Sequence, residues 1–271
     1  MRIAVVTPVR NAESYVAETI QSIVSQRAYL DGRVELDYLV WDGASTDRTV
    51  EMATHAMGPH GRVVSQRDSG MYDGLGQAFA EVGGDVYFYL NAGDLLQPGC
   101  FDFLVEAFES QANDWVCGLH LYYSSRGDIV GARLPFRYTK RRILRGHYGR
   151  GLPTIQQEST FWSQRLMKLV NLDELRTFKL AGDFYLWHRF AETTVPAIAS
   201  IALGGFRYHG SHLSADMDRY RAEISAIAGP LRLWDIVPLA AEKALWHVPH
   251  RLRKRWSGPA ALVDPAYYGS R

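Results

Sequence analysis

The feature that most constrains the fold is a short strand signature at residues 86–90, Val-Tyr-Phe-Tyr-Leu, with glycines on both sides. An apolar and aromatic run of this length, bounded by glycines, is typical of a strand that is covered on both faces in the middle of a parallel sheet. The run leads directly into a turn, Asn91-Ala-Gly-Asp94. Open α/β sheets bind ligands at the carboxyl ends of their strands, which makes Asp94 a candidate binding residue. The alternative interpretation is a polar turn that caps the next helix.

The first 118 residues alternate between strand-like and helix-like segments. Apolar residues recur at helical spacing between the strands, as in 16–24, and a helix capped by Ser45 is expected to run to about Met57. Strands that alternate with helices of this length predict a mostly parallel, Rossmann-like α/β sheet with right-handed crossovers. The expected strands are 3–6, 36–41, 62–66, 86–90 and 115–119.

The regular alternation of strand-like and helix-like segments ends near residue 119. Segments 121–123 and 129–133 are expected to pair as a hairpin in an antiparallel addition, and the chain beyond residue 215 has a helical pattern. The sequence has no repeats and no low-complexity linker. We therefore expect two halves of one compact body, followed by a helical C-terminal extension. The expected boundaries are 1–118, 119–215 and 216–271.

Composition narrows the class of protein. The formal net charge of +1 gives no reason to expect nucleic-acid binding. Cys100 and Cys117 have neither disulfide density nor metal spacing, so a reducing, cytoplasmic compartment is expected. No apolar run reaches membrane-spanning length. Segment 231–256 mixes tryptophans with arginines, which predicts peripheral contact with an anionic membrane surface; the alternative is a helix packed on the core.

Three aspartates lie at or just after successive strand ends: Asp42, Asp73 and Asp94. In a parallel sheet all three are expected along the carboxyl edge. The glycine-rich phosphate loop of dinucleotide-binding folds is absent after the first strand, where residues 7–12 read Thr-Pro-Val-Arg-Asn-Ala. A nucleotide held here would depend on hydrogen bonds to its base and ribose and on a divalent metal at its phosphates. Carboxylate ligands suit Mg²⁺ or Mn²⁺.

An ordered set of segments resembles the family 2 glycosyltransferases with the GT-A fold, and it covers about residues 3 to 214. Each motif is weak alone, but the order of the set is specific. Leu90-Asn-Ala-Gly-Asp94, for example, stands where that family carries its aspartate-rich metal motif. The resemblance implies a nucleotide-sugar-binding half at 1–118 and an acceptor-binding half at 119–215. The matching segments are 7–11, 19–26, 42–49, 68–73, 90–94, 155–162, 181–187 and 206–211.

The resemblance implies a donor site in the first half. Pro8 and Asp42 would hold the nucleobase, with Thr7 contributing through its backbone. Asp73 would lie beside the ribose or the first phosphate. UDP is the first expectation, although Asp42 can equally accept the ring N–H of thymine or guanine. The full donor-contacting set is Thr7, Pro8, Asn11, Asp42, Asp73, Asn91 and Ala92.

The resemblance also implies the chemistry. Asp94 would ligate Mn²⁺ or Mg²⁺ on the diphosphate, with His209 as a further ligand. Asp183 would be the general base, because a sugar hydroxyl is a poor nucleophile and needs a carboxylate within hydrogen-bond reach. The alternative reading makes Asp183 a helix N-cap. The expected reaction is inverting transfer of a sugar to a hydroxyl of a bacterial-type glycan, free or lipid-linked.

Two departures from the family pattern leave an alternative open. Asn91 stands where an acidic residue is usual, and residues 74–77 read Gly-Leu-Gly-Gln in place of Ala-x-Asn-Lys. They motivate the alternative of a non-catalytic sugar-nucleotide-binding or scaffold protein. The basic segment 137–150 has two interpretations as well, a clamp or lid over the diphosphate and a solvated loop. Because all four aspartates are present, we expect an active enzyme.

Overall fold

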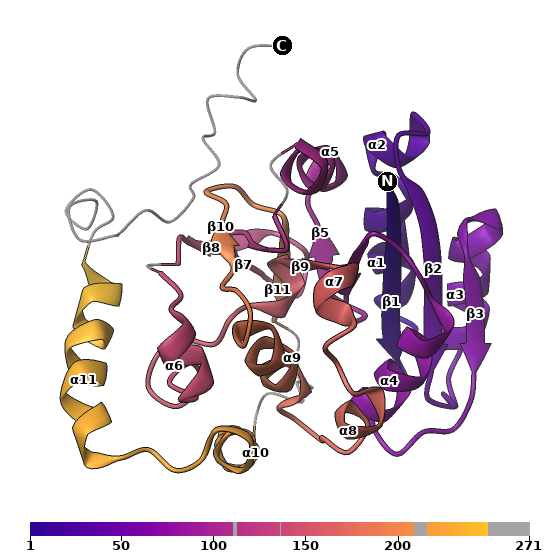
Figure 1. Ribbon diagram of the computed structural model, residues 1–271. Coiled ribbons are helices and arrows are strands. Elements are labelled where there is room, and N and C mark those ends of the chain that lie inside the picture. The colour runs from indigo at the N-terminus through magenta and orange to yellow at the C-terminus, as the bar shows by residue number, and fades with distance from the viewer. Residues whose placement is uncertain (111–112, 136, 209–215, 249–271) are drawn as a thin grey trace.

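A computed structural model of the 271-residue chain describes residues 1–110, 113–135, 137–208 and 216–248. Two sheets organise it: a central sheet of order β10-β6-β9-β4-β1-β2-β3 and a smaller one of order β5-β11-β7-β8 (Figure 1). The strands are β1 (Arg2–Val9), β2 (Glu35–Asp42), β3 (Arg62–Ser65), β4 (Val86–Tyr89), β5 (Leu95–Leu96), β6 (Trp115–Cys117), β7 (His120–Tyr123), β8 (Ile129–Arg133), β9 (Thr160–Ser163), β10 (Ala197–Ile198) and β11 (Gly204–Arg207).

Helices connect these strands and form the C-terminal extension. The α-helices are α1 (Val16–Val24), α2 (Arg27–Leu30), α3 (Thr49–Met57), α4 (Met71–Glu81), α5 (Cys100–Val105), α6 (Lys140–Leu144), α7 (Gln164–Met167), α8 (Leu172–Leu175), α9 (Gly182–Ala191), α10 (Met217–Ala228) and α11 (Leu233–His247). Short turns of other helix types are η1 (Gly58–His60), η2 (Glu106–Ser110) and η3 (Gln157–Ser159).

The predicted mostly parallel sheet is confirmed. β1 pairs in parallel with both β2 and β4, and β2 pairs in parallel with β3. All four residues of β4 are buried, as the apolar run at 86–90 predicts. The chain steps outward from β1 to β2 to β3 and then returns to β4 on the other side of β1. With the usual right-handed crossovers, this strand order puts α4 on the face opposite α1 and α3.

One helix begins later than the sequence predicts. The expected cap Ser45 instead binds Asp42, to which it donates both its backbone N–H (3.0 Å) and its hydroxyl. Helix α3 starts at Thr49, whose N–H donates to Asp47 Oδ1 over 3.0 Å. Residues 43–48 therefore form a loop at the carboxyl edge of the sheet, and this loop holds Asp42.

The second half of the chain enters the same central sheet. β9 lies between β4 and β6 and is antiparallel to both. The predicted hairpin is confirmed as the antiparallel pair β7–β8. In the smaller sheet, β11 lies between β5 and β7. This arrangement brings the end of β11 next to the loop that follows β4.

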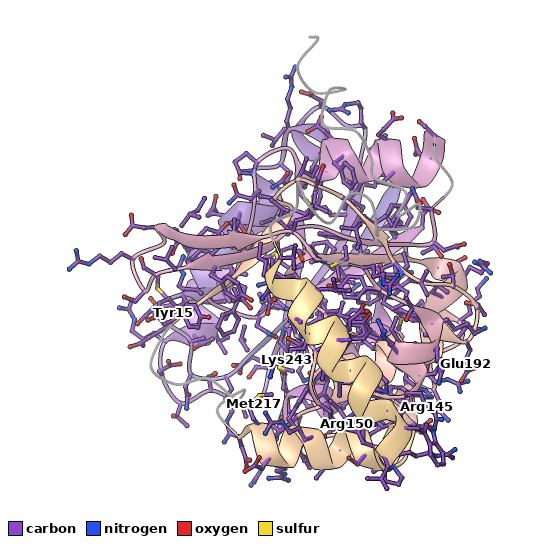
Figure 2. The ribbon with its side chains drawn as sticks, turned by 90° about the vertical axis from the view of Figure 1, so that its left-hand side faces the viewer. Tyr15, Arg145, Arg150, Glu192, Met217 and Lys243 are labelled. Atoms are coloured by element: carbon purple, nitrogen blue, oxygen red, sulfur yellow. The ribbon has the colours of Figure 1, made fainter. Side chains whose placement is uncertain are left out.

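The C-terminal extension is helical, as predicted, and docks on the basic segment 137–150. Arg150 donates to Ser225 Oγ (2.9 Å) and to the Gly229 carbonyl (2.8 Å), at the end of α10. Buried Glu242 of α11 pairs with Arg137 at 3.1 Å and also with Arg142. Figure 2 shows α11 crossing this side of the molecule, with Arg145 and Arg150 near its junction with α10. Three arginines of this segment thus hold the extension, a role that the sequence analysis did not assign to them.

Among the described residues, no single helix has the length and apolar character needed to cross a membrane, whereas α10 and α11 together, with a bend of 109° between them, meet that test by length and composition.

Candidate active site

The loops after β1 and β2 are joined at the carboxyl edge. Asn11 Oδ1 accepts the N–H of Thr46 over 2.9 Å, and the Asn11 N–H donates to Ser45 Oγ over 2.7 Å. Asn11 has a φ of 50°, in the left-handed region that asparagine tolerates better than most residues. The side chain of Asn11 therefore braces two loops, and its donor contact stays a prediction.

Asp42 ends β2 and is fully buried. Its carboxylate accepts the two hydrogen bonds from Ser45 and a third from Ser65 Oγ at 2.6 Å. A buried carboxylate needs such donors, because an unpaired charge in the interior is costly. On the neighbouring strand, the Thr7 hydroxyl bonds to the Tyr38 hydroxyl (2.9 Å) inside the core, and Pro8 is buried beside it. Thr7 is fully buried, and the contact predicted between its backbone and a donor stays a prediction.

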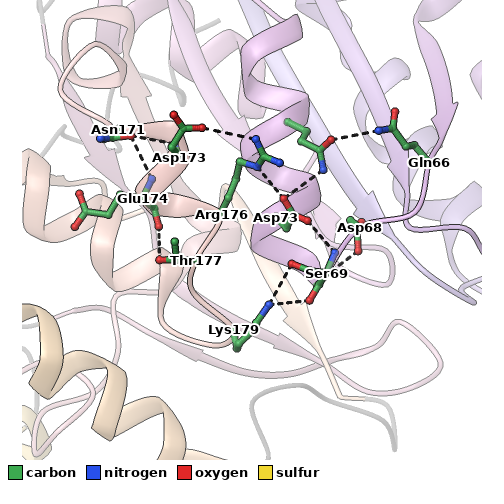
Figure 3. Close-up of polar contacts among 12 residues, drawn as sticks. Gln66, Asp68, Ser69, Asp73, Asn171, Asp173, Glu174, Arg176, Thr177 and Lys179 are labelled. Carbon is green, nitrogen blue, oxygen red and sulfur yellow. Dashed lines mark hydrogen bonds and ion pairs between the residues drawn. The ribbon is translucent and has the colours of Figure 1, made fainter.

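Asp73 lies in the first turn of α4, surrounded by donors (Figure 3). Its carboxylate accepts the Nε–H of Arg176 and the N–H of Ser69, each over 2.8 Å. Partial burial opposes ionisation, but these hydrogen bonds outweigh it and lower the pKa of Asp73. Lys179 Nζ donates to the Ser69 carbonyl over 2.9 Å. The segment between α8 and α9 therefore places two cations beside the predicted ribose and phosphate site.

Asp68 is a further carboxylate at this edge that sequence reasoning left without a role. A β-carbon added at Gly74 would lie 2.6 Å from Asp68 Oδ2, and one at Gly43 would lie 2.9 Å away. Both glycines make room for this carboxylate between β2 and α4. Burial raises the pKa of Asp68 above its ordinary value, and nearby Asp73 adds to this. Its position inside the 68–73 motif was the signal that could have found it.

Asp94 sits in a loop that is held from two sides. The Gly93 N–H donates to the Thr19 hydroxyl (2.9 Å), which donates in turn to the Asp94 carbonyl (2.9 Å). From β11, the Arg207 N–H donates to Asp94 Oδ1 over 3.0 Å. The Asp94 residue is only 3% exposed. Burial, together with the neighbouring carboxylate of Glu158, raises the pKa of Asp94 well above its ordinary value.

The loop also offers an unsatisfied oxygen. Asn91 Oδ1 is buried and has no hydrogen-bond partner within the described part of the chain. Ala92, between Asn91 and the carboxylate, is partly exposed. An amide oxygen and a carboxylate are both hard ligands of the kind that Mg²⁺ and Mn²⁺ take. The Asn91–Asp94 loop thus fits one side of a divalent metal.

Glu158 is the main residue that the sequence analysis missed. It lies in η3, just before β9, and is 7% exposed. Burial, and then the charge of Asp183, raise the pKa of Glu158 to about 7. The signal available in the sequence was an acidic residue inside the matched segment 155–162, just before the Thr-Phe-Trp-Ser residues of β9.

Asp183 lies in the first turn of α9, and its carboxylate accepts the Tyr220 hydroxyl at 3.2 and 3.3 Å. The N-cap of α9 is Ala181, so the alternative reading of Asp183 as the N-cap is wrong. A β-carbon at Gly182 would lie 2.3 Å from the ring of Tyr72, so the glycine admits this ring beside Asp183. Burial raises the pKa of Asp183 to about 7, against hydrogen bonds that include those from Tyr220 and Tyr72.

The structure thus places the acidic residues, predicted and unpredicted, in two groups. The charge of Glu158 acts on Asp94, and the charge of Asp183 acts on Glu158. No three histidine, cysteine or acidic side chains in the described ranges could hold a metal ion among themselves. Asp42, Asp68 and Asp73 lie along the edge formed by β2 and α4. His209, the other predicted metal ligand, lies outside the described residues.

Comparisons with known proteins agree with this architecture. The model for "Glycosyl transferase family 2" matches residues 4–165, more than half of the chain. A search of the curated proteins found no match.

Two solved structures illustrate the shared fold. Staphylococcus aureus TarS 1-349, in complex with UDP-GlcNAc, superposes with a TM-score of 0.63 at 16% identity, covering 99% of this chain and 78% of that one. Mycobacterium tuberculosis glucosyl-3-phosphoglycerate synthase, in complex with Mg²⁺ and UDP, gives a TM-score of 0.58 at 21% identity, covering 86% and 81%. The chain belongs to glycosyl transferase family 2 and is a glycosyltransferase with the GT-A fold.

Proposed function

We propose that this protein is an inverting glycosyltransferase that moves a sugar from a UDP-sugar to a hydroxyl of a glycan or lipid-linked glycan. The observation that carries the proposal is Asp183. It is a carboxylate on a fixed helix turn, in the same cluster as Asp94, with a pKa raised to about 7 by burial. A general base works best when its pKa lies near the operating pH.

The choice of donor rests on the fold and on the relatives. The similar structures hold UDP-GlcNAc or UDP. In this chain, Asp42 at the end of β2 would accept the ring N–H of the nucleobase. Arg176 and Lys179 add positive charge near the phosphates of a donor placed beside Asp73.

A divalent metal fits the Asn91–Asp94 loop. Asp94 would supply a carboxylate and Asn91 its unpartnered amide oxygen, with the remaining positions left to diphosphate oxygens and water. When bound, the metal neutralises charge on the leaving diphosphate. A related synthase has been crystallised with Mg²⁺ and with Mn²⁺.

In the proposed reaction, the acceptor hydroxyl donates its proton to the Asp183 carboxylate as its oxygen attacks the anomeric carbon. The bond from that carbon to the diphosphate oxygen breaks on the opposite face, and UDP leaves with the electron pair. One C–O bond forms as another breaks, so the configuration inverts. Arg176 and Lys179 stabilise the negative charge of the departing diphosphate.

A cytoplasmic location at the inner face of the membrane is part of the proposal. Leu233 and Trp234, at the start of α11, are 82% and 62% exposed, and Arg232 precedes them. Aromatic and basic side chains together favour the interface of an anionic membrane. A lipid-linked acceptor would be reached from that position.

A thermal-shift panel tests the donor site first. UDP-, GDP- and dTDP-sugars are compared in Mn²⁺, Mg²⁺ and EDTA, because a ligand that binds only the folded state raises the melting temperature. We expect UDP-sugars to raise the melting temperature only when Mn²⁺ or Mg²⁺ is present. A shift in EDTA would contradict the role given to Asp94, and no shift for any nucleotide sugar would contradict the donor site.

Asp183→Asn separates catalysis from binding. We expect UDP-sugars to raise the melting temperature of the variant as they do for the wild type, again only with metal. The rate of UDP release should fall by at least about 100-fold, because the general base is gone. If the wild type and Asp183→Asn show equal rises in melting temperature and equal rates of UDP release, the assignment of Asp183 as the base is wrong. A wild-type protein that binds UDP-sugars but neither hydrolyses nor transfers them would favour the alternative of a non-catalytic binding protein, which the uncharged Asn91 motivates.

A further inference from the structure

The C-terminal extension reaches into the catalytic centre. Helix α10 lies beside the start of α9 and is outside residues 4–165, which the family model matches (Figure 1). The two helices share a small apolar cluster of Ala181, Phe184, Tyr220 and Ile224. A β-carbon at Gly149 would lie 2.7 Å from Ile224, so the basic segment also makes room for α10. Helix α10 is therefore held against the element that carries Asp183.

Tyr220 contacts the reactive carboxylate directly. Its hydroxyl is 3.2 Å from Asp183 Oδ2 and 3.3 Å from Oδ1, and the tyrosine is only 9% exposed. Burial, and then the charge of Asp183, raise the pKa of Tyr220 well above its ordinary value. The phenol therefore stays protonated at neutral pH and donates to Asp183.

A second residue of α10 holds the backbone that leads into α9. Glu223, one turn after Tyr220, accepts the N–H groups of Lys179 (3.2 Å), Leu180 (3.0 Å) and Ala181 (2.9 Å). Residues three apart on a helix lie on one face, so one face of α10 holds both the Asp183 carboxylate and the chain just before it.

We propose that Tyr220 is a positioning residue for the general base and that α10 thereby completes the active site. The inference rests on the proposed function, since it concerns the same base. A carboxylate on the first turn of a helix can rotate about its side-chain bonds. The hydrogen bond from the Tyr220 hydroxyl holds the Asp183 carboxylate in one orientation. The remaining lone pairs of its oxygens are then left for the acceptor hydroxyl. Small errors in the orientation of a reacting group lower rates steeply.

The groups that face Asp183 determine how its pKa changes when the Tyr220 hydroxyl is removed. Tyr72 approaches from α4, Tyr220 from α10 and Glu158 from η3, while the Phe184 N–H donates within α9 over 2.7 Å. Hydroxyl donors stabilise the ionised form, whereas Glu158 disfavours it. Removal of the Tyr220 hydroxyl is therefore expected to raise the pKa of Asp183.

The test is Tyr220→Phe in the full-length chain, with two readouts. Asp183 is titrated in metal-free protein by ¹³C NMR of carboxyl-labelled aspartate, with its signal assigned through Asp183→Asn. We expect a midpoint higher by about 0.5 to 1 pH unit, the effect of one lost hydrogen bond to a charged group. UDP release from UDP-GlcNAc, with water as acceptor, should fall about three- to tenfold at pH 7, and less at pH 9. Donor affinity, measured by calorimetry, should not change.

Tyr185→Phe is the matched control. It removes a tyrosine hydroxyl from α9 itself, one that donates to Glu174 (2.9 Å) and the Asn171 carbonyl, not to Asp183. We expect its Asp183 midpoint and UDP release to equal those of the wild type. Glu223→Gln is a second test variant and should lower UDP release without changing donor affinity, because the backbone before Asp183 loses a charged acceptor.

The outcomes separate this inference from the proposed function. An unchanged Asp183 midpoint in Tyr220→Phe would overturn the hydrogen bond, and a raised midpoint with unchanged UDP release would overturn the positioning role. Unchanged release in Glu223→Gln would argue against α10 as part of the site. If Asp183→Asn releases UDP as fast as the wild type, the base assignment itself fails, whatever Tyr220 does.

Discussion

At the scale of single residues, the site depends on carboxyl groups whose surroundings differ sharply. Asp42 is buried but accepts three hydrogen bonds, whereas Glu158 is buried near other carboxylates. Asp73 has an arginine partner, and its pKa is lowered. The same chemical group thus serves as a fixed acceptor, an ion-pair partner or a proton carrier, according to the donors and charges around it.

Glu158→Gln tests this reading through stability. The folded-state pKa of Glu158 is about 7 against an ordinary 4.5, mainly because of burial. Between these values the folded protein holds a proton that the unfolded chain has lost, so wild-type stability falls as pH rises through this window. Glutamine does not titrate. We therefore expect the variant to gain up to about 3 kcal/mol relative to the wild type between pH 4.5 and 8.

Urea denaturation in EDTA at several pH values measures the effect. Glu81→Gln, which changes an exposed carboxylate on α4, is the control and should follow the wild type. A difference between Glu158→Gln and the wild type that does not vary with pH would contradict the shifted pKa.

At the scale of elements, the start of α9 is where three helices meet. Gly182 admits the ring of buried Tyr72 from α4, and Glu223 of α10 accepts the N–H groups just before it. The absence of a side chain at Gly182 is therefore a packing requirement. It lets α4 and α9 approach closely enough for Tyr72 to reach Asp183.

Gly182→Ala should displace this junction. The new methyl group would lie 2.3 to 2.6 Å from three atoms of the Tyr72 ring, so the ring or the helix has to move. We expect about 1 to 3 kcal/mol of destabilisation from overpacking, and at least a tenfold loss of UDP release from the displaced base. Thermal melts and initial rates measure both.

Gly83→Ala is the matched control. No atom lies within 4 Å of its added β-carbon, and it stands between α4 and β4, away from the site. Its stability should change by less than about 1 kcal/mol, and its rate should stay at the wild-type value. Wild-type activity in Gly182→Ala would show that the junction tolerates rearrangement.

At the scale of the whole molecule, the basic segment 137–150 joins the C-terminal helices to the catalytic body. Glu242 of α11 is 2% exposed and pairs with Arg137 and Arg142, while Arg150 binds the end of α10. The segment was expected to be either a clamp on the diphosphate or a solvated loop. Its described arginines at 137, 142 and 150 instead contact the extension.

Glu242→Gln should weaken that connection. The change leaves two arginines without their buried anion, and we expect a loss of about 2 kcal/mol in the free energy of unfolding, less than for a fully buried pair because Arg137 is partly exposed. Limited proteolysis between α10 and α11 should be faster. Glu51→Gln breaks an exposed pair with Arg48 and should leave the stability nearly unchanged, because water and salt screen that pair. Equal proteolysis of wild type and Glu242→Gln would contradict this view of the connection.

The sequence by itself determined the main strands of the first half and the acidic residues at their ends. The apolar run at 86–90 and the alternation of strands and helices were sufficient for the parallel sheet, because periodicity and local turns record which face of an element is buried. The motifs also placed Asp42, Asp73 and Asp94 at the edge of that sheet. Such features depend on neighbours close along the chain.

Only the tertiary structure decided which distant segments share the site. Glu158 lies near Asp94 because β9 inserts antiparallel beside β4. Tyr220 donates a hydrogen bond to Asp183 because α10 packs against α9. Helix α3 begins at Thr49 and not just after Ser45, because Ser45 donates hydrogen bonds to Asp42 and does not cap the helix. Long-range pairing and side-chain competition of this kind leave no periodic trace in a sequence, because the contacts join residues that the chain separates and the core brings together.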